Sequence, residues 1–293
     1  MKSHVSPYRN RRAVLATKHH KEKAISRPLQ EAIGLSVFVP ADLDTDLLGT
    51  FSGEVERDGT PSNVVVRKAR FGMAAAGVAL GVASEGSFRP HAELSFVVGC
   101  HELMAFVDDD VGLVVVEDLF TLDTNFGNAK ARDTAGMFEF LDRAKFPTHG
   151  LIVVPNDRIK VGHDDRIRLV LENVPDQQVF KGISDLAKLD QVVRRCAAMS
   201  SDGFAHVETD MRAHFNPTRM RTINALAVQL GQRLATPCPK CGAPGWGRLS
   251  ATWEMPVDGA PFVARETVGC AGCGHRQESP SGPDFDQRHA AND

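Results

Sequence analysis

Four cysteines near the C-terminus are the residues whose types and spacing most clearly predict chemistry. They form two pairs, Cys238 with Cys241 and Cys270 with Cys273, with two residues between the members of each pair. A glycine follows each second cysteine, which lets the backbone turn back so that its N–H groups face the sulfurs. Four thiolates complete the tetrahedral shell of Zn²⁺, so we predict a structural zinc site with no open position. Two disulfides are the alternative, but cysteines this close in sequence are poor disulfide partners.

Two predicted strand ends carry polar side chains, at the place where α/β proteins build their sites. The segment 17–23 follows the opening strand and begins a helix, so Thr17 and Lys21 are predicted to bind an anion such as phosphate. In the segment 83–91 an apolar strand ends in Glu-Gly, which makes Glu85 a candidate catalytic or metal-binding acid. The alternatives are a solvated first turn and an ordinary acid at a strand end.

A polar segment at 44–57 is rich in glycine, threonine and acids, which predicts an exposed loop. Glu54 or Glu56 in this loop could bind Mg²⁺ through carboxylate oxygens. The helix that follows carries Lys68 and Arg70, which could contact a phosphate that the metal bridges. The alternative is a surface loop beside a charged helix face.

A basic cluster lies at the start of the last predicted helix. Arg212, His214 and Arg219 lie at or just before its N-terminus, where the helix dipole disfavours cations. We therefore expect an anion to sit between them. The alternative is that Glu208 and Asp210 pair with the arginines and leave no site.

The remaining pattern predicts the elements that position these residues. From 13 to 235, short apolar runs alternate with helical stretches, which indicates an α/β domain with a mixed sheet flanked by helices. Strands are expected at 13–17, 35–39, 78–84, 103–107, 113–117, 151–154, 167–171 and 206–209. Helices are expected at 21–33, 61–76, 133–144, 184–199 and 217–234, the first of them kinked or shortened by Pro28.

A zinc ribbon at 236–278 and a disordered tail at 279–293 are expected to follow this domain. Between the two cysteine pairs, Trp246, Trp253 and Phe262 can pack a core that is too small to stand without metal.

The composition gives no sign of a membrane or nucleic-acid protein. The net charge is −3, so no global field attracts polyanions. No stretch approaches the roughly 18 apolar residues of a membrane span, and the basic start lacks the apolar run of a signal peptide. We therefore expect a soluble cytoplasmic protein with a small-molecule phosphate or nucleotide ligand, and no membrane partner. Its oligomeric state stays open.

Six sequence segments together resemble an uncharacterised bacterial domain family that carries a C-terminal four-cysteine ribbon. These segments are T-K-H-H-K-E-K, D-T-D-L-L-G-T-F-S-G-E-V-E-R, R-K-A-R-F-G-M, A-S-E-G-S-F-R-P-H, F-K-G-I and T-D-M-R-A-H-F-N-P-T-R-M. The resemblance spans about residues 13–274 and implies no known activity.

Residues 13–90 also resemble the inosine/xanthosine triphosphate pyrophosphatases, including their non-canonical purine branch. Those enzymes carry T-x-N-x-x-K after the first strand, N-R-A or K-A-R on a helix, and E-G-G or D-D-S-G after the next strand. The residues that match are Thr17, Lys21, Lys68, Ala69, Arg70, Glu85 and Gly86, and His19 stands where the family has asparagine. Arg212, His214 and Arg219 match a late Ser-His-Arg segment loosely.

This second resemblance implies a Mg²⁺-dependent pyrophosphatase that acts on nucleoside triphosphates. Glu85, with Glu56 or Glu54, would hold Mg²⁺, while Lys21, Lys68 and Arg219 would hold the triphosphate. Attack on the α-phosphoryl group by a water that Mg²⁺ orients would then release pyrophosphate and the nucleoside monophosphate.

Two other functions stay open. In one, the ribbon binds nucleic acid or a partner protein through Lys240, Trp246, Arg248 and Arg265, and the α/β domain is only a scaffold. In the other, the α/β domain senses a nucleotide without hydrolysing it.

Overall fold

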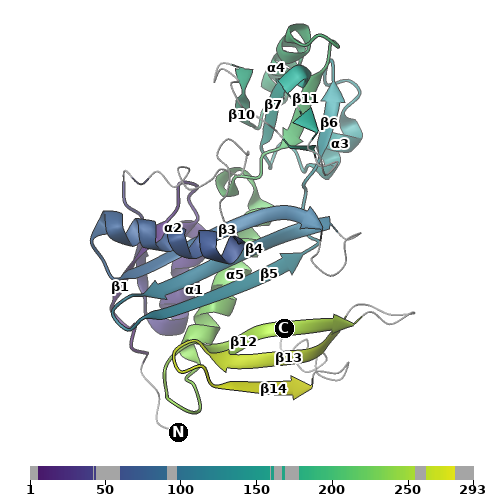
Figure 1. Ribbon diagram of the computed structural model, residues 1–293. Helices are drawn as coiled ribbons and strands as arrows, with labels where there is room; N and C mark the ends of the chain where they lie inside the picture. Colours follow the sequence, from purple (N-terminus) through teal and green to yellow (C-terminus); the bar gives the residue numbers. More distant parts are fainter. Residues whose placement is uncertain are drawn as a thin grey trace.

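In the described part of the chain, β-sheets of five, four and three strands form the framework, and a two-stranded sheet accompanies them. The computed structural model describes residues 6–41, 43, 60–90, 98–158, 160–161, 167–168, 178–254 and 262–280. A five-stranded sheet lies in the middle of the molecule, with a four-stranded sheet above it and a three-stranded sheet below it (Figure 1). Helices flank the sheets, and the first sheet mixes parallel and antiparallel pairs, so the predicted fold class is confirmed.

The first sheet has the order β2-β1-β3-β4-β5. β1 pairs in parallel with β2 and β3, whereas β3, β4 and β5 pair antiparallel. Its strands are β1 (Arg12–Ala16), β2 (Ser36–Phe38), β3 (Leu80–Pro90), β4 (Val98–Asp108) and β5 (Leu113–Thr121).

Helices cover both faces of this sheet. α1 (Glu22–Ile33) and α5 (Pro217–Ala235) pack on one face, and α2 (Pro61–Ala76) packs on the other (Figure 1). Side chains of a strand point alternately to the two faces, so Leu15 joins the core with α1 and α5 while Val14 joins the core with α2. Burial on both faces explains why β1 is continuously apolar.

The early end of β1 creates the setting for a site. Ala16, the last residue of β1, pairs with Ala83 of β3, and β3 then continues alone on this side as far as Pro90. The polar residues that follow Ala83 therefore lie beside the start of α1, at the carboxyl end of a parallel strand.

Pro28 does not shorten α1, which runs from Glu22 to Ile33, contrary to one of the two effects that we expected. A proline has no N–H, so the carbonyl of Ala24, four residues earlier, loses its helical donor. The side-chain amide of Asn224 in α5 donates to this carbonyl at 2.8 Å, which replaces the missing hydrogen bond. The partner helix thus compensates for the proline, and the helix runs on to Ile33.

A second sheet has the order β10-β7-β11-β6, and all of its pairs are antiparallel. It has its own apolar core, so the range 13–235 contains two sheets with separate cores. A short η4 segment (Ala213–Phe215) connects β11 to α5. The elements are β6 (Asn128–Ala131), β7 (Leu151–Pro155), β10 (Phe180–Ile183), β11 (Ala205–Thr209), α3 (Phe138–Arg143) and α4 (Leu186–Met199).

Most of the predicted elements are present, but the sequence pattern missed β6 and β10. Both are four-residue strands at the edges of the second sheet, too short to show a clear alternation. β3 and β4 also extend beyond the predicted ranges, because polar residues continue their pairing. Of the strand predicted at 167–171, the described part is β9 (Ile167–Arg168), which pairs with β8 (Lys160–Val161).

The C-terminal sheet consists of β12 (Trp246–Glu254), β13 (Phe262–Cys270) and β14 (Arg276–Pro280). Residues 279 and 280, which we expected in the tail, belong to β14, and the rest of that tail lies outside the described residues. Arg233 of α5 fixes this sheet to the first one. Its buried guanidinium pairs with Glu117 of β5 and donates to the carbonyl of Gly245 at 3.2 Å.

Candidate functional site

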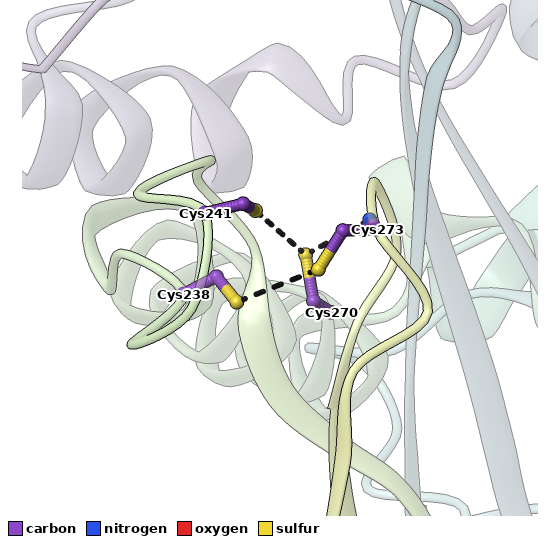
Figure 2. Close-up of side chains that lie close together, drawn as sticks. All are labelled: Cys238, Cys241, Cys270 and Cys273. Carbon is purple, nitrogen blue, oxygen red and sulfur yellow. Dashed lines mark hydrogen bonds between the residues drawn. The ribbon is translucent and has the colours of Figure 1, made fainter.

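The four C-terminal cysteines converge as a possible metal centre. The Sγ atoms of Cys238 and Cys273 lie 3.8 Å apart, those of Cys241 and Cys270 lie 3.7 Å apart, and all four lie within 4.8 Å of one another (Figure 2). A tetrahedral Zn²⁺ with bonds of about 2.3 Å requires sulfur–sulfur distances of about 3.8 Å. The four sulfurs are therefore spaced as zinc ligands, and they could hold a zinc ion.

Two matching turns present these sulfurs. The N–H of Lys240 donates to Cys238 Sγ, and the N–H of Cys273 donates to Cys270 Sγ, each at 3.4 Å. Gly242 and Gly274 have φ angles of 73° and 71°, the left-handed region that other residues rarely adopt. The turn predicted from the glycines is present in both knuckles. None of the four cysteines forms a disulfide.

A second cluster of charged side chains lies where β1 ends. It contains three buried cations, Lys21 at the N-cap of α1, Lys68 of α2 and Arg219 of α5, together with the buried carboxylates of Glu85 and Glu102. The Lys68 ammonium lies 3.3 Å from the Glu85 carboxylate, and Arg219 pairs with Glu102. These five residues are called the cation cluster below. It brings together four of the residues that the sequence singled out, from three different helices and a strand.

Lys21 differs from the other two cations in its partners. Its Nζ donates to the side chain of Ser84 at 2.9 Å and to the carbonyl of the same residue at 3.2 Å. Both acceptors are neutral, whereas Lys68 and Arg219 each pair with a carboxylate. The cluster thus holds three buried cations against two carboxylates.

The register of β3 and β4 allows Arg219 to reach Glu102. Gly86 lies directly opposite Glu102 in the antiparallel pair. A Cβ at position 86 would collide with the Glu102 carboxylate and with a guanidinium nitrogen of Arg219. Only glycine therefore leaves room for this ion pair. Arg219 also donates to the carbonyl of Met211, which fixes the start of α5.

The charges of the cluster shift the pKa values of two of its neighbours. Burial, with the adjacent Arg219 and Lys68, lowers the pKa of Lys21 to about 7. Burial and the nearby Lys21 lower the pKa of His19 to about 2, so its imidazole is neutral at any working pH. The ring of His19 stacks on that of His214 at 5.2 Å. Burial is the larger cause of both shifts, and the neighbouring positive charges add to it.

The pKa of Lys21 predicts a pH dependence of stability. Its folded pKa of about 7 lies below the ordinary value of 10.5, so unfolding takes up a proton between these pH values. The free energy of unfolding should therefore rise as the pH increases from about 7 to 10.5. We expect urea titrations to show this rise, and Lys21→Met to flatten it because the variant lacks the titrating amine. Identical pH profiles for the two proteins would contradict it.

The other predicted site residues lie around the cluster or apart from it. Thr17 is buried and accepts from the N–H of His19 at 3.2 Å, which shapes the turn before α1. Arg70 lies toward the opposite end of β3 and pairs with Asp109 at 3.1 Å, so it is not part of the cluster. Glu54, Glu56 and most of the loop predicted at 44–57 lie outside the described residues.

Arg212 has the internal partner that our alternative interpretation named. It pairs with the buried Asp210 at 2.6 Å, and the same carboxylate accepts the N–H of Gly182 in β10 at 3.0 Å. This contact connects the second sheet to the segment before α5. Arg219, in contrast, pairs with Glu102, a residue that the sequence interpretation did not consider. An acidic residue within a largely apolar strand was the sequence signal that could have identified it.

Glu85 does not belong to a group of metal ligands within the described residues. Only the four cysteines bring three or more ligand atoms close enough for an ion in that part of the chain. The carboxylate of Glu85 lies beside the Lys68 ammonium instead. The described residues therefore give no support for a Mg²⁺ site, and Glu54 and Glu56, the other proposed ligands, lie outside them.

The fold and the cysteine cluster define a mixed α/β protein with a C-terminal module that could hold zinc. The chain matches a family model described as "Domain of unknown function (DUF6671)" over residues 68–282, and it belongs to that family. The matched range includes four members of the cation cluster and all four cysteines, but not Lys21. No curated protein and no solved structure matches the chain. In the part of the chain that the structure describes, no helix could cross a membrane.

Proposed function

We propose that the cation cluster binds the phosphate groups of a nucleoside triphosphate, and that the protein acts on this ligand as a pyrophosphatase. One observation carries the proposal: Lys21 is buried between two other cations and is held only by neutral oxygens of Ser84. A buried charge is costly unless an opposite charge accompanies it. A phosphate would supply that charge, and it would raise the pKa of Lys21 again.

Buried polar atoms without partners give independent support. Five such side-chain atoms occur in the described part of the chain, and Glu102 Oε2, Ser87 Oγ and His214 Nδ1 are three of them. Glu102 belongs to the cluster and His214 stacks on His19, whereas Ser87 follows Gly86 on β3 with its side chain on the other face of the sheet. Unsatisfied buried groups in one region often mark the position of a ligand or water.

In this proposal the cluster provides electrostatic stabilisation. Lys21, Lys68 and Arg219 would neutralise charge that develops on the phosphates, in a site already preorganised by its ion pairs. Glu85 is the candidate acid–base group, since its carboxylate lies beside the Lys68 ammonium. We assign no step to Mg²⁺.

Replacement of Lys21 should test the phosphate site. Lys21→Met should weaken binding of tripolyphosphate and of inosine triphosphate by roughly 1.5–3 kcal/mol, the typical value of a charged hydrogen bond. At pH 8, binding to the wild type should also take up a fraction of a proton, because the free amine has a pKa of about 7. Titration calorimetry in two buffers of different ionisation enthalpy measures both effects.

Lys23→Met is the matched control, since Lys23 lies in the first turn of the same helix but is exposed. It should bind both ligands almost as the wild type does. Equal losses in the two variants would mean that general surface charge attracts the anion, and the proposed site would be wrong. Incubation with a panel of nucleoside triphosphates, with and without Mg²⁺, then tests hydrolysis through separate assays of pyrophosphate and phosphate.

We further propose that the four cysteines bind zinc in a structural role. Four sulfurs at tetrahedral spacing leave no coordination position for a substrate. The alternative function, a ribbon that binds nucleic acid, has no specific support. Its described basic residues, Lys240, Arg248, Arg265 and Arg276, are accompanied by Glu266 and Glu278.

A further inference from the structure

Two aromatic rings stack on each other at the far end of β3. The rings of Phe88 and Phe126 lie nearly parallel, with an interplanar angle of 10° and a centroid distance of 5.2 Å. Phe88 belongs to β3, and Phe126 belongs to the segment between β5 and β6 that leads to the second sheet. Phe126 is 46% exposed, so part of its ring is accessible to solvent. The pair therefore presents part of an aromatic surface to solvent.

Both rings are tied to the cation cluster. Phe88 lies two residues after Gly86, on the same face of the sheet and roughly 7 Å farther along the strand. Phe126 follows Asn125, whose side chain accepts from Asn216 at 2.8 Å. Asn216 in turn accepts the N–H of Arg219 at 2.9 Å as the cap of α5. The stacked pair thus lies on the side of Arg219 where β3 leaves the cluster.

This arrangement provides separate contacts for two chemically different parts of one ligand. The cluster suits phosphates, and an exposed aromatic face a short distance away suits a planar ring, because every base has a π-face that stacks on aromatic side chains. Along β3, Phe88 lies roughly 7 Å beyond Gly86, which faces Arg219, and roughly 13 Å beyond Ser84, which holds Lys21, so one extended ligand could contact both parts.

We propose that Phe88 and Phe126 form the base-binding subsite of the nucleotide whose phosphates occupy the cation cluster. This inference rests on the function proposed above. It adds a prediction of its own: binding of a nucleotide depends on the aromatic pair, whereas binding of an inorganic polyphosphate does not. The subsite would stack the base without reading its edge, so nucleoside triphosphates as a class are the expected ligands.

The test compares inosine triphosphate with tripolyphosphate on the same variants. Phe126→Ala should weaken binding of inosine triphosphate about 5- to 150-fold, the range observed for loss of base stacking, and should leave tripolyphosphate binding unchanged. Phe126→Tyr should retain nucleotide binding, because it keeps the ring. Phe138→Ala is the control. Phe138 is 75% exposed, but it lies at the start of α3, which packs against the second sheet. It should bind both ligands as the wild type does.

The failures of the two proposals give different results. If Phe126→Ala binds inosine triphosphate and tripolyphosphate as the wild type does, the aromatic pair is only a packing contact and the subsite is wrong while the phosphate site stands. If the wild type binds neither ligand, the phosphate site and the subsite are both wrong. If Phe126→Ala weakens binding of both ligands to the same extent, Phe126 serves to hold α5 in position. The proposed subsite would then also be wrong.

Discussion

Removal of zinc from the purified protein should unfold the C-terminal sheet and leave the other two sheets folded. Structural zinc contributes about 10–16 kcal/mol in small zinc-binding peptides, which is more than a three-stranded sheet can lose. The cores of the first two sheets contain no zinc-binding cysteine, so they should keep their packing. The expected zinc content before chelation is one ion per chain.

Tryptophan fluorescence can follow this transition selectively. The chain has two tryptophans, Trp246 and Trp253, and both belong to β12 of the C-terminal sheet. The Trp246 ring stacks on His275 at 5.4 Å, next to the second knuckle, so its emission should shift when the knuckles open. Far-UV circular dichroism should change little, because the helices lie elsewhere.

Cys270→Ser should have the same effect as chelation. Cys196→Ala is the control, because Cys196 is buried in α4 and lies in the core of the second sheet. That variant should keep its zinc even if it loses some stability. A wild-type protein with less than about half an equivalent of zinc, purified from zinc-replete cells, would contradict the four-thiolate site.

Arg219→Met should destabilise the whole fold by about 3–5 kcal/mol, because it leaves the carboxylate of Glu102 buried without its partner. Arg221→Met should cost about 1 kcal/mol or less. Arg221 is two residues away on the same helix, but its partner Asp123 is exposed. Urea unfolding of both variants measures the difference. The comparison separates a buried ion pair from a surface pair in one helix.

A double variant makes this test independent of side-chain size. Arg219→Met with Glu102→Leu removes both buried charges, so it should recover much of the stability that the single variant loses. Similar stabilities for Arg219→Met and the wild type would mean that Glu102 takes up a proton or finds water, and the ion pair would not be a major support of α5. The double variant should still lose tripolyphosphate binding, since it lacks a cation of the cluster.

The sequence by itself determined the features that depend on near neighbours. The cysteine spacing and the following glycines fix the knuckles, because the first sulfur of each pair accepts an N–H from two or three residues away. The helix that begins at Pro61 is likewise local, since Thr60 caps it by accepting the N–H of Asn63. The clusters of polar residues at strand ends could also be recognised, and four of the residues they contain meet in the cation cluster.

Only the tertiary structure decided which of these residues meet. Lys21 and Ser84 are 63 residues apart, and Arg219 and Glu102 are 117 apart, so their contacts depend on the register of β3 and β4 and on the packing of α5. A one-residue shift in that register would turn Glu102 to the other face of the sheet. Local sequence cannot specify such a register, which is why Glu102 was missed and Arg70 was grouped with residues that lie elsewhere. The charge excess around Lys21 exists only because the fold buries three cations from three helices beside two carboxylates.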